Sequence, residues 1–160
     1  MKSESELILP PQNLAREVAA LTACNTLLAR HGHHLTPADA AMLAEARGRS
    51  LAAHGRVEFG EGILPRLLYA FCDAPALRGD ALAEAVPELL DIFYYLKNET
   101  AERLTDDELL DWMADSFNTT CHGSLELLAV RAAEGLIRSV LGLDGDDYPE
   151  PDEEEEPYDE

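Results

Sequence analysis

"LLDIFYYL", residues 89–96, decides the fold, because almost every side of this stretch would be apolar if it were wound as a helix. Such a helix is stable only where other elements cover it on several sides. Asp80 is a suitable cap for its start, and Pro87 is expected to kink it or to begin its second half. We therefore expect a central, most buried helix over residues 81–99, with Asp91 as the one acid that it could bury.

Five further helices are expected around this one, from capping residues and from apolar residues at spacings of three and four. Thr36 and Thr105 each begin a segment with the composition of a helix start, and Thr105 forms a capping-box pattern with Glu108. Strand signals are nearly absent. The sequence thus predicts an all-α fold, a compact single-domain bundle or orthogonal array of about six helices. The five helices are expected at residues 13–31, 36–54, 63–72, 105–117 and 124–141.

The end of the chain differs in composition from the rest. Residues 144–160 hold eleven carboxylates and three prolines, without Lys or Arg. Self-repulsion, the prolines and the lack of aliphatic side chains predict a disordered acidic C-terminal tail. We therefore divide the chain into an N-terminal extension over residues 1–11, a helical domain over residues 12–143 and the tail over residues 144–160.

The charge and composition of the chain argue against several classes of function. A formal net charge of −20 repels phosphate groups, so we expect no binding to nucleic acid or to anionic membranes. The sequence has no apolar run long enough to span a bilayer, and its start lacks the features of a signal peptide. Three well-separated cysteines do not indicate a disulfide framework. We therefore expect a cytoplasmic protein with reduced thiols and without a cofactor.

Two pairs of residues at predicted helix ends could carry chemistry. Cys121 and His122 lie in the joint before the last helix, whose positive end would favour a thiolate. Cys72 and Asp73 lie at another helix end, and the four residues could bind a metal if the two ends met. The alternative, in which both cysteines are buried apolar residues, stays open, because no C-x-x-C or H-x-x-x-H spacing supports a metal site.

A locally basic hairpin offers a different kind of site. Four arginines and four of the five histidines lie between residues 30 and 56. One hypothesis is that residues 144–160 fold back weakly on this hairpin and guard a face that binds something anionic, or that the tail reaches a basic partner. Exposed ion pairs are weak and are screened by salt, so salt would weaken such docking. The residues concerned are Arg30, Arg47, Arg49 and Arg56 in the hairpin and Glu153, Glu154, Glu155 and Glu156 in the tail.

Two blocks of the sequence resemble a known family. They are "GRVEFGEGILPRLLYAFCDAP" at residues 55–75 and "FYYLKNETAERLTDDELLDWMADSFNTTCHGSLELLA" at residues 93–129. In these blocks the chain resembles a functionally uncharacterised family of short, helical bacterial proteins, and the resemblance covers about residues 12–141. It implies a bacterial, intracellular setting. It brings no activity, so no catalytic residue can be transferred to this chain.

The lack of a catalytic pattern favours binding over catalysis. The sequence contains no G-x-S-x-G, no P-loop and no G-x-G-x-x-G motif before a helix. Glu84, Glu88, Asp91 and Tyr95 recur at helical spacing, which we interpret as a solvated stripe rather than a two-metal site. The expected function is a non-enzymatic protein-interaction module with an unknown protein partner, and a homodimer is one option. The alternatives are a metal-binding or thiol-dependent enzyme that uses Cys72, Asp73, Cys121 and His122 and, more weakly, an acidic mimic of nucleic acid.

Overall fold

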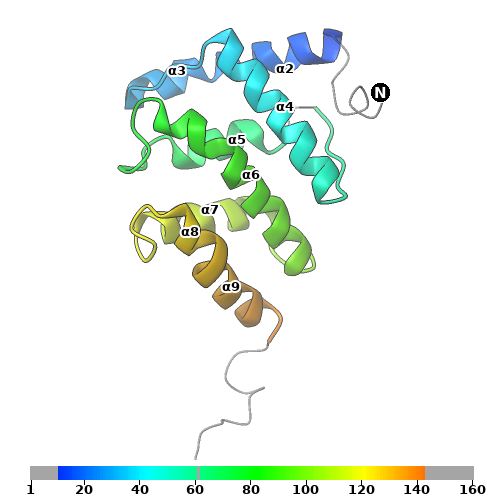
Figure 1. The fold of residues 1–160 in the computed structure, drawn as a ribbon, viewed down its shortest axis with the longest axis vertical. Coiled ribbons are helices and arrows are strands. Elements are labelled where there is room, and N and C mark those ends of the chain that lie inside the picture. Colours follow the sequence, from blue (N-terminus) through cyan, green and yellow to red (C-terminus); the bar gives the residue numbers. More distant parts are fainter. Residues whose placement is uncertain (1–10, 61, 143–160) are drawn as a thin grey trace, which may run out of the picture.

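The structure, a computed structural model, describes residues 11–60 and 62–142, and this part of the chain contains helices and no strand (Figure 1). The predicted all-α fold is thereby confirmed. The acidic tail and the first ten residues of the N-terminal extension lie outside the described residues. The elements are α2 (Pro11–Ala23), α3 (Asn25–Leu28), the 3-10 turn η1 (Ala29–His31), α4 (Pro37–Ala53), α5 (Leu64–Phe71), α6 (Ala81–Glu99), α7 (Asp106–Asn118), α8 (Leu125–Leu127), the π-helical segment η2 (Leu128–Ala132) and α9 (Ala133–Val140).

The helices form three hairpins that stack on one another (Figure 1). α2 pairs with α4, α5 pairs with α6, and α7 pairs with the helix that runs from α8 through η2 to α9. In this stack α4, α6 and α9 form one layer, and α2, α5 and α7 form the other. α6 contacts α4, α5, α7 and α9, so it occupies the centre of the fold, as the sequence predicted.

The side chains of α6 supply much of the core. Leu89, Leu90, Phe93, Tyr94 and Leu96 are all fully buried. Burial of one large apolar side chain stabilises a fold by about 1.5–3 kcal/mol, so this helix alone makes a large contribution. The apolar run over residues 89–96 is therefore the part of the chain around which the other helices pack.

Two expectations for α6 need correction. The helix runs as one element through Pro87, so Pro87 does not begin a separate second half, and its predicted kink stays a prediction. Asp91, the one acid that this helix could have buried, is exposed, and 59% of its side chain is accessible to solvent. Asp91 lies on the exposed stripe of α6, at the side where Ser50 and His54 of the α4 region reach its carboxylate.

The helices of the α4, α6 and α9 layer begin at equal spacing. Thr36, Asp80 and Ser124 occupy the N-cap positions, each 44 residues after the one before. Thr36 accepts a hydrogen bond from the Asp39 N–H and Ser124 accepts one from the Leu127 N–H. The Asp80 side chain makes no such bond, so its predicted capping role is wrong. The spacing is typical of helical repeats of about 40–47 residues, although the sequence itself shows no evident repeat.

Two predicted helices are interrupted in the structure. The first, residues 13–31, breaks at Cys24, next to which Asn25 bonds both backbone groups of Leu35 at 2.8 and 2.9 Å. These bonds tie the break to the turn that precedes α4. The last predicted helix, residues 124–141, contains the π-helical segment η2, an irregularity that apolar periodicity does not reveal.

A buried histidine joins the first hairpin to the second. His33 is 5% exposed, and its Nε2 donates a hydrogen bond to the Cys72 carbonyl oxygen at 2.7 Å. Its Nδ1 lies 3.4 Å from the Gly79 carbonyl oxygen. Both carbonyl groups belong to the segment between α5 and α6, so His33 holds the turn before α4 against that segment. The next residue, His34, is exposed.

Replacement of His33 tests this link. We expect His33→Ala to lower the free energy of unfolding by about 1–3 kcal/mol, because a buried carbonyl group loses its donor. His34→Ala is the matched control, and we expect it to change stability by less than about 0.5 kcal/mol. Urea unfolding followed by circular dichroism measures both changes. Equal losses in the two variants would show that the His33 hydrogen bonds do not join the hairpins.

Candidate functional site

A buried arginine on α4 lies between α2 and the segment that joins α4 to α5, which we call the linker. Arg47 on α4 is 5% exposed. Its Nη1 donates to Glu17 Oε2 at 2.6 Å, and its Nε donates to Glu58 Oε1 at 2.8 Å. Burial acts to lower the pKa of Arg47, but the hydrogen bond to Glu58 and the charge of Glu17 outweigh it, so the pKa is raised. The guanidinium therefore stays charged inside the protein and holds α2 and the linker against α4.

The linker is shaped around the same ion pair. Glu58 Oε1 also accepts a hydrogen bond from the Ile63 N–H at 3.4 Å, just before α5 begins. A Cβ atom at Gly62 would lie 2.7 Å from Arg47 Nη2 and would also clash with the Glu58 carboxylate. Gly62 has a φ of 63°, as does Gly60, where a Cβ atom would meet nothing within 4 Å. The two glycines share a backbone conformation, but only Gly62 makes room for the ion pair.

Tyr94 brings a buried hydroxyl group to this region. The residue is fully buried, and its hydroxyl has no hydrogen-bond partner among the described residues. Burial, together with the negative charge of Glu58, raises the pKa of Tyr94. Glu58, whose charge acts on the phenol, is itself bonded to Arg47. We interpret the cluster of Arg47, Glu17, Glu58 and Tyr94 as structural, because buried charges of this kind are stable only when paired.

Ser50, His54 and Asp91 have the residue types of a hydrolase triad. The Ser50 hydroxyl donates to Asp91 Oδ1, and His54 Nε2 lies 3.4 Å from the same oxygen. In a catalytic triad the histidine stands between the serine and the carboxylate, so that it can take the serine proton. Here the carboxylate stands between the other two, so the Ser50 hydroxyl is bonded to Asp91 and not to the imidazole. The arrangement links α4 to α6 and does not have the order of a catalytic triad.

The metal-binding alternative from the sequence is wrong for the described residues. The two predicted helix ends do meet, since a Cβ atom at Gly123 would lie 2.6 Å from Ala76 Cβ. Their functional groups do not converge, however, and nowhere in residues 11–60 and 62–142 do three His, Cys, Asp or Glu residues gather as metal ligands. Adjacent residues point apart at these turns: Cys72 and Cys121 are buried, whereas Asp73 and His122 are exposed.

The predicted basic hairpin presents fewer free cations than its sequence suggests. Arg30 and Arg49 are exposed, but Arg47 is buried between its two carboxylates. Arg56 forms an ion pair with Glu102 at 2.7 Å. Docking of the acidic tail stays a prediction, because Glu153, Glu154, Glu155 and Glu156 lie outside the described residues.

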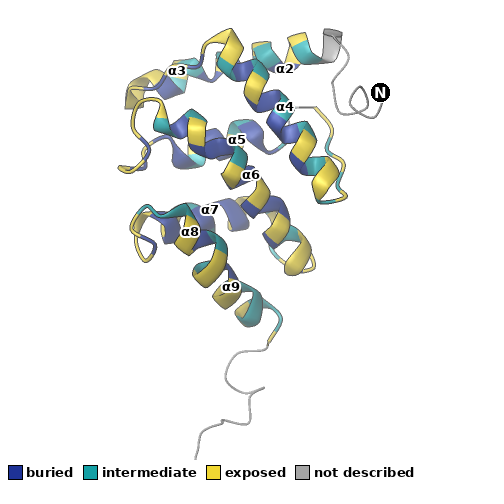
Figure 2. Ribbon diagram, viewed as in Figure 1, coloured by how far each residue is buried: buried dark blue, intermediate teal, exposed yellow. Residues whose placement is uncertain are grey.

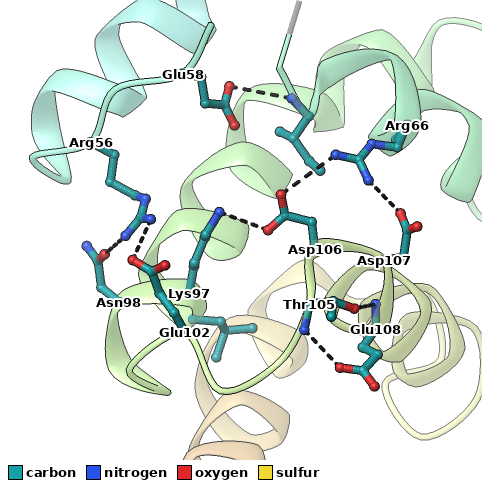
Figure 3. Close-up of polar contacts among 12 residues, drawn as sticks. Arg56, Glu58, Arg66, Lys97, Asn98, Glu102, Thr105, Asp106, Asp107 and Glu108 are labelled. Carbon is teal, nitrogen blue, oxygen red and sulfur yellow. Dashed lines mark hydrogen bonds and ion pairs between the residues drawn. The ribbon is translucent and has the colours of Figure 1, made fainter.

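Further ion pairs join the linker to the turn between α6 and α7, and join α5 and α6 to the start of α7 (Figure 3). The ion pair of Glu102 with Arg56 lowers the pKa of the Glu102 carboxyl group and joins this turn to the linker. Lys97 binds Asp106 at 2.8 Å, and Arg66 binds Asp107 at 2.7 Å. These surface pairs contribute little energy individually. Since Arg56, Arg66 and Lys97 are each paired with a carboxylate, we do not assign a binding site here.

A groove between α6 and α9 is the best candidate for a binding site. Its volume is about 460 Å³. Tyr95 on α6 and Val130 in η2 face it with exposed fractions of 42% and 61%, which are large for such side chains. Glu99 and Glu134 add negative charge to the groove. Arg138 also lines it, and its side chain is already engaged in an interaction within the protein. The groove therefore combines an accessible apolar surface with carboxylates.

This groove was not predicted from the sequence. The helix expected at residues 124–141 carried no prediction of a second apolar face, yet Val130 and Ile137 both line the groove. Apolar residues outside the main stripe of a helix were the signal that could have indicated a second apolar face. Tyr95, in contrast, belongs to the predicted solvated stripe and is exposed, but the stripe by itself gave no sign of a groove.

The comparisons with known proteins place the fold in a family without an assigned role. A model described as "Family of unknown function (DUF6323)" matches residues 20–142, which is more than half of the chain. No curated protein matches the chain, and no solved structure does. Among the described residues, no helix has both the length and the apolar character needed to cross a membrane.

The two linker glycines provide a first test of the Arg47 cluster. We expect Gly60→Ala to lower the free energy of unfolding by about 1–2 kcal/mol, the cost of a side chain at positive φ. Gly62→Ala carries the same backbone cost and also displaces Glu58 from Arg47, so we expect a loss of about 3 kcal/mol or more. Chemical unfolding of both variants measures the difference. Equal losses would mean that the ion pair tolerates a side chain at this position.

The thiols provide a second test. Burial, with a further contribution from the charge of Asp73, raises the pKa of Cys72, so this residue remains a thiol at neutral pH. Since Cys24 and Cys121 are also buried, we expect all three to react with iodoacetamide at least about tenfold more slowly in the folded protein than in denaturant. Intact-mass spectrometry over time measures the rates. Rapid labelling of Cys121 in the folded protein would instead support a thiol-dependent activity.

Proposed function

We propose that this chain, which belongs to the family of unknown function that its residues 20–142 match, is a protein-interaction module. In this proposal the groove between α6 and α9 holds a segment of another protein that carries apolar and basic side chains. The observation that supports it best is the exposure of Tyr95 and Val130 beside carboxylates in one groove. Exposed apolar surface rimmed by polar groups is typical of sites that bind other proteins.

The apolar part of the groove favours a partner that buries side chains there. Tyrosine is enriched among residues that dominate binding energy, because it combines a large apolar ring with a polar end. Tyr95 and Val130 line the same groove from two different helices, so an aliphatic side chain that fills the groove would contact both helices. Such a contact needs no change in the core, since neither residue is buried.

The charge of the groove favours a basic partner. Glu99 and Glu134 line it, and the chain as a whole has a formal net charge of −20. Complementary charge speeds association and disfavours acidic competitors. Three free cysteines fit a reducing compartment, and we therefore place this interaction in the cytoplasm.

A displayed library of random peptides, selected on the full chain, tests the proposal. We expect the enriched peptides to combine apolar residues with Lys or Arg. Tyr95→Ala should weaken their binding about tenfold, because the ring supplies part of the apolar contact. Tyr69→Ala is the matched control, since Tyr69 is also 42% exposed but lies on α5 in the other layer. We expect this control to bind the peptides as the unaltered protein does.

Three outcomes would overturn the proposal. The first is that selection enriches no peptides, and the second is that Tyr95→Ala and Tyr69→Ala behave alike. The third is that the purified chain sediments as a dimer which Tyr95→Ala dissociates, because the occupant of the groove would then be a second copy of the chain.

A further inference from the structure

A second groove lies on the other side of α6, beside the start of this helix. It has a volume of about 380 Å³ and is formed by the turn before α4, the start of α4 and the start of α6. Met42 on α4 is 45% exposed and lines this groove. Asp39 and Glu84 add carboxylates, and His34 lies beside them. Like the α6–α9 groove, it combines an accessible apolar side chain with negative charge.

An exposed stripe on α6 connects the two grooves. Figure 2 shows exposed turns of α6 in the layer that it forms with α4 and α9. The exposed residues follow one another at spacings of three or four, which places them on one face of the helix. They begin in the groove beside α4 and end in the groove beside α9. The stripe consists of Glu84, Glu88, Asp91, Tyr95 and Glu99.

The stripe also sets the distance between the grooves. Glu84 lines one groove and Tyr95 lines the other, and they are eleven residues apart. At the rise of an α-helix this separation is about 16 Å along the axis, and it is close to three whole turns. Both side chains therefore leave α6 in nearly the same direction, so one ligand on this face can reach both grooves.

The carboxylates between the grooves are available to different degrees. Asp91 accepts a hydrogen bond from Ser50 and has His54 nearby, so it is partly engaged. Glu84 and Glu88 have no ion-pair partner among the described residues. Glu84 and Glu88, on adjacent turns of α6, are therefore available to bind cationic groups of a ligand that lies across the helix.

From this arrangement we infer that one partner segment bridges both grooves. The segment is a cationic amphipathic helix with two apolar side chains about eleven residues apart, one for each groove. Lys or Arg side chains between them lie over Glu84 and Glu88. The inference rests on the proposed function, and it adds the length, conformation and charge pattern of the partner.

A helical partner fits this surface better than an extended one. The stripe lies on a helix, so it offers no row of unpaired backbone groups, as a sheet edge would, to which an extended segment could bond. A partner helix satisfies its own backbone. It also repeats its side chains every three or four residues, which matches the spacing of the stripe.

Three labelled synthetic helices of equal length, measured by fluorescence anisotropy with the full chain, test the inference. The first has two Leu residues about eleven positions apart with Lys residues between them. The second has Glu in place of Lys, and the third has the two Leu residues at about half that spacing. We expect the first to bind at least about tenfold more tightly than either of the others. We also expect salt to weaken its binding.

Variants of the protein assign the contacts of the first helix. We expect Met42→Ser and Tyr95→Ala each to weaken its binding about tenfold, since each removes one apolar contact. The double variant Glu84→Gln with Glu88→Gln should weaken it about three- to tenfold and reduce its dependence on salt.

A matched control removes two charges elsewhere. Asp111→Asn with Asp115→Asn neutralises two exposed carboxylates on α7, in the other layer, and should leave the affinity unchanged. If only Tyr95→Ala weakens binding, the bridging inference is overturned and the proposed function stands. If the Glu helix binds as tightly as the Lys helix, or if none of the three binds, the inference is also overturned, and the library selection then decides the proposed function separately.

Discussion

The burial of α6 is the constraint on which the rest of the structure depends. A helix that is apolar on most sides needs several neighbours, and α4, α5, α7 and α9 supply that cover. The face that remains meets solvent and carries carboxylates together with Tyr95, side chains that are stable in water. The two grooves flank this face. The surface that we assign to partner binding is therefore a consequence of how the core closes around one helix.

The buried guanidinium of Arg47 joins α4 to α2 and to the linker. It needs carboxylates beside it, and Glu58 turns inward from the linker to provide one of them. Val57 and Phe59, on either side of Glu58, are 79% and 90% exposed. Their exposure accompanies the inward position of Glu58, and we assign no binding role to them.

The sequence predicts those parts of the fold that depend on local signals. The capping boxes at Thr36 and Thr105 and the apolar run of α6 placed three helices within one or two residues. The burial of Arg47 could not be predicted, because its partners lie 30 and 11 residues away and nothing local marks them as partners. The groove was missed for a related reason: Val130 lies in a π-helical segment, which a periodicity of 3.6 residues cannot describe.

The π-helical segment η2 connects the core to the groove. Leu128 in this segment is fully buried, whereas Val130, two residues later, is 61% exposed in the groove. π-helical turns are rare in proteins as a whole. Where they occur, they often lie at functional sites. Conversion of η2 to a regular turn would rotate α9 by about one residue, or 100°, relative to α6. Different side chains would then face Tyr95, so the groove depends on this irregular turn, and the proposed function depends on its geometry rather than on a reactive group.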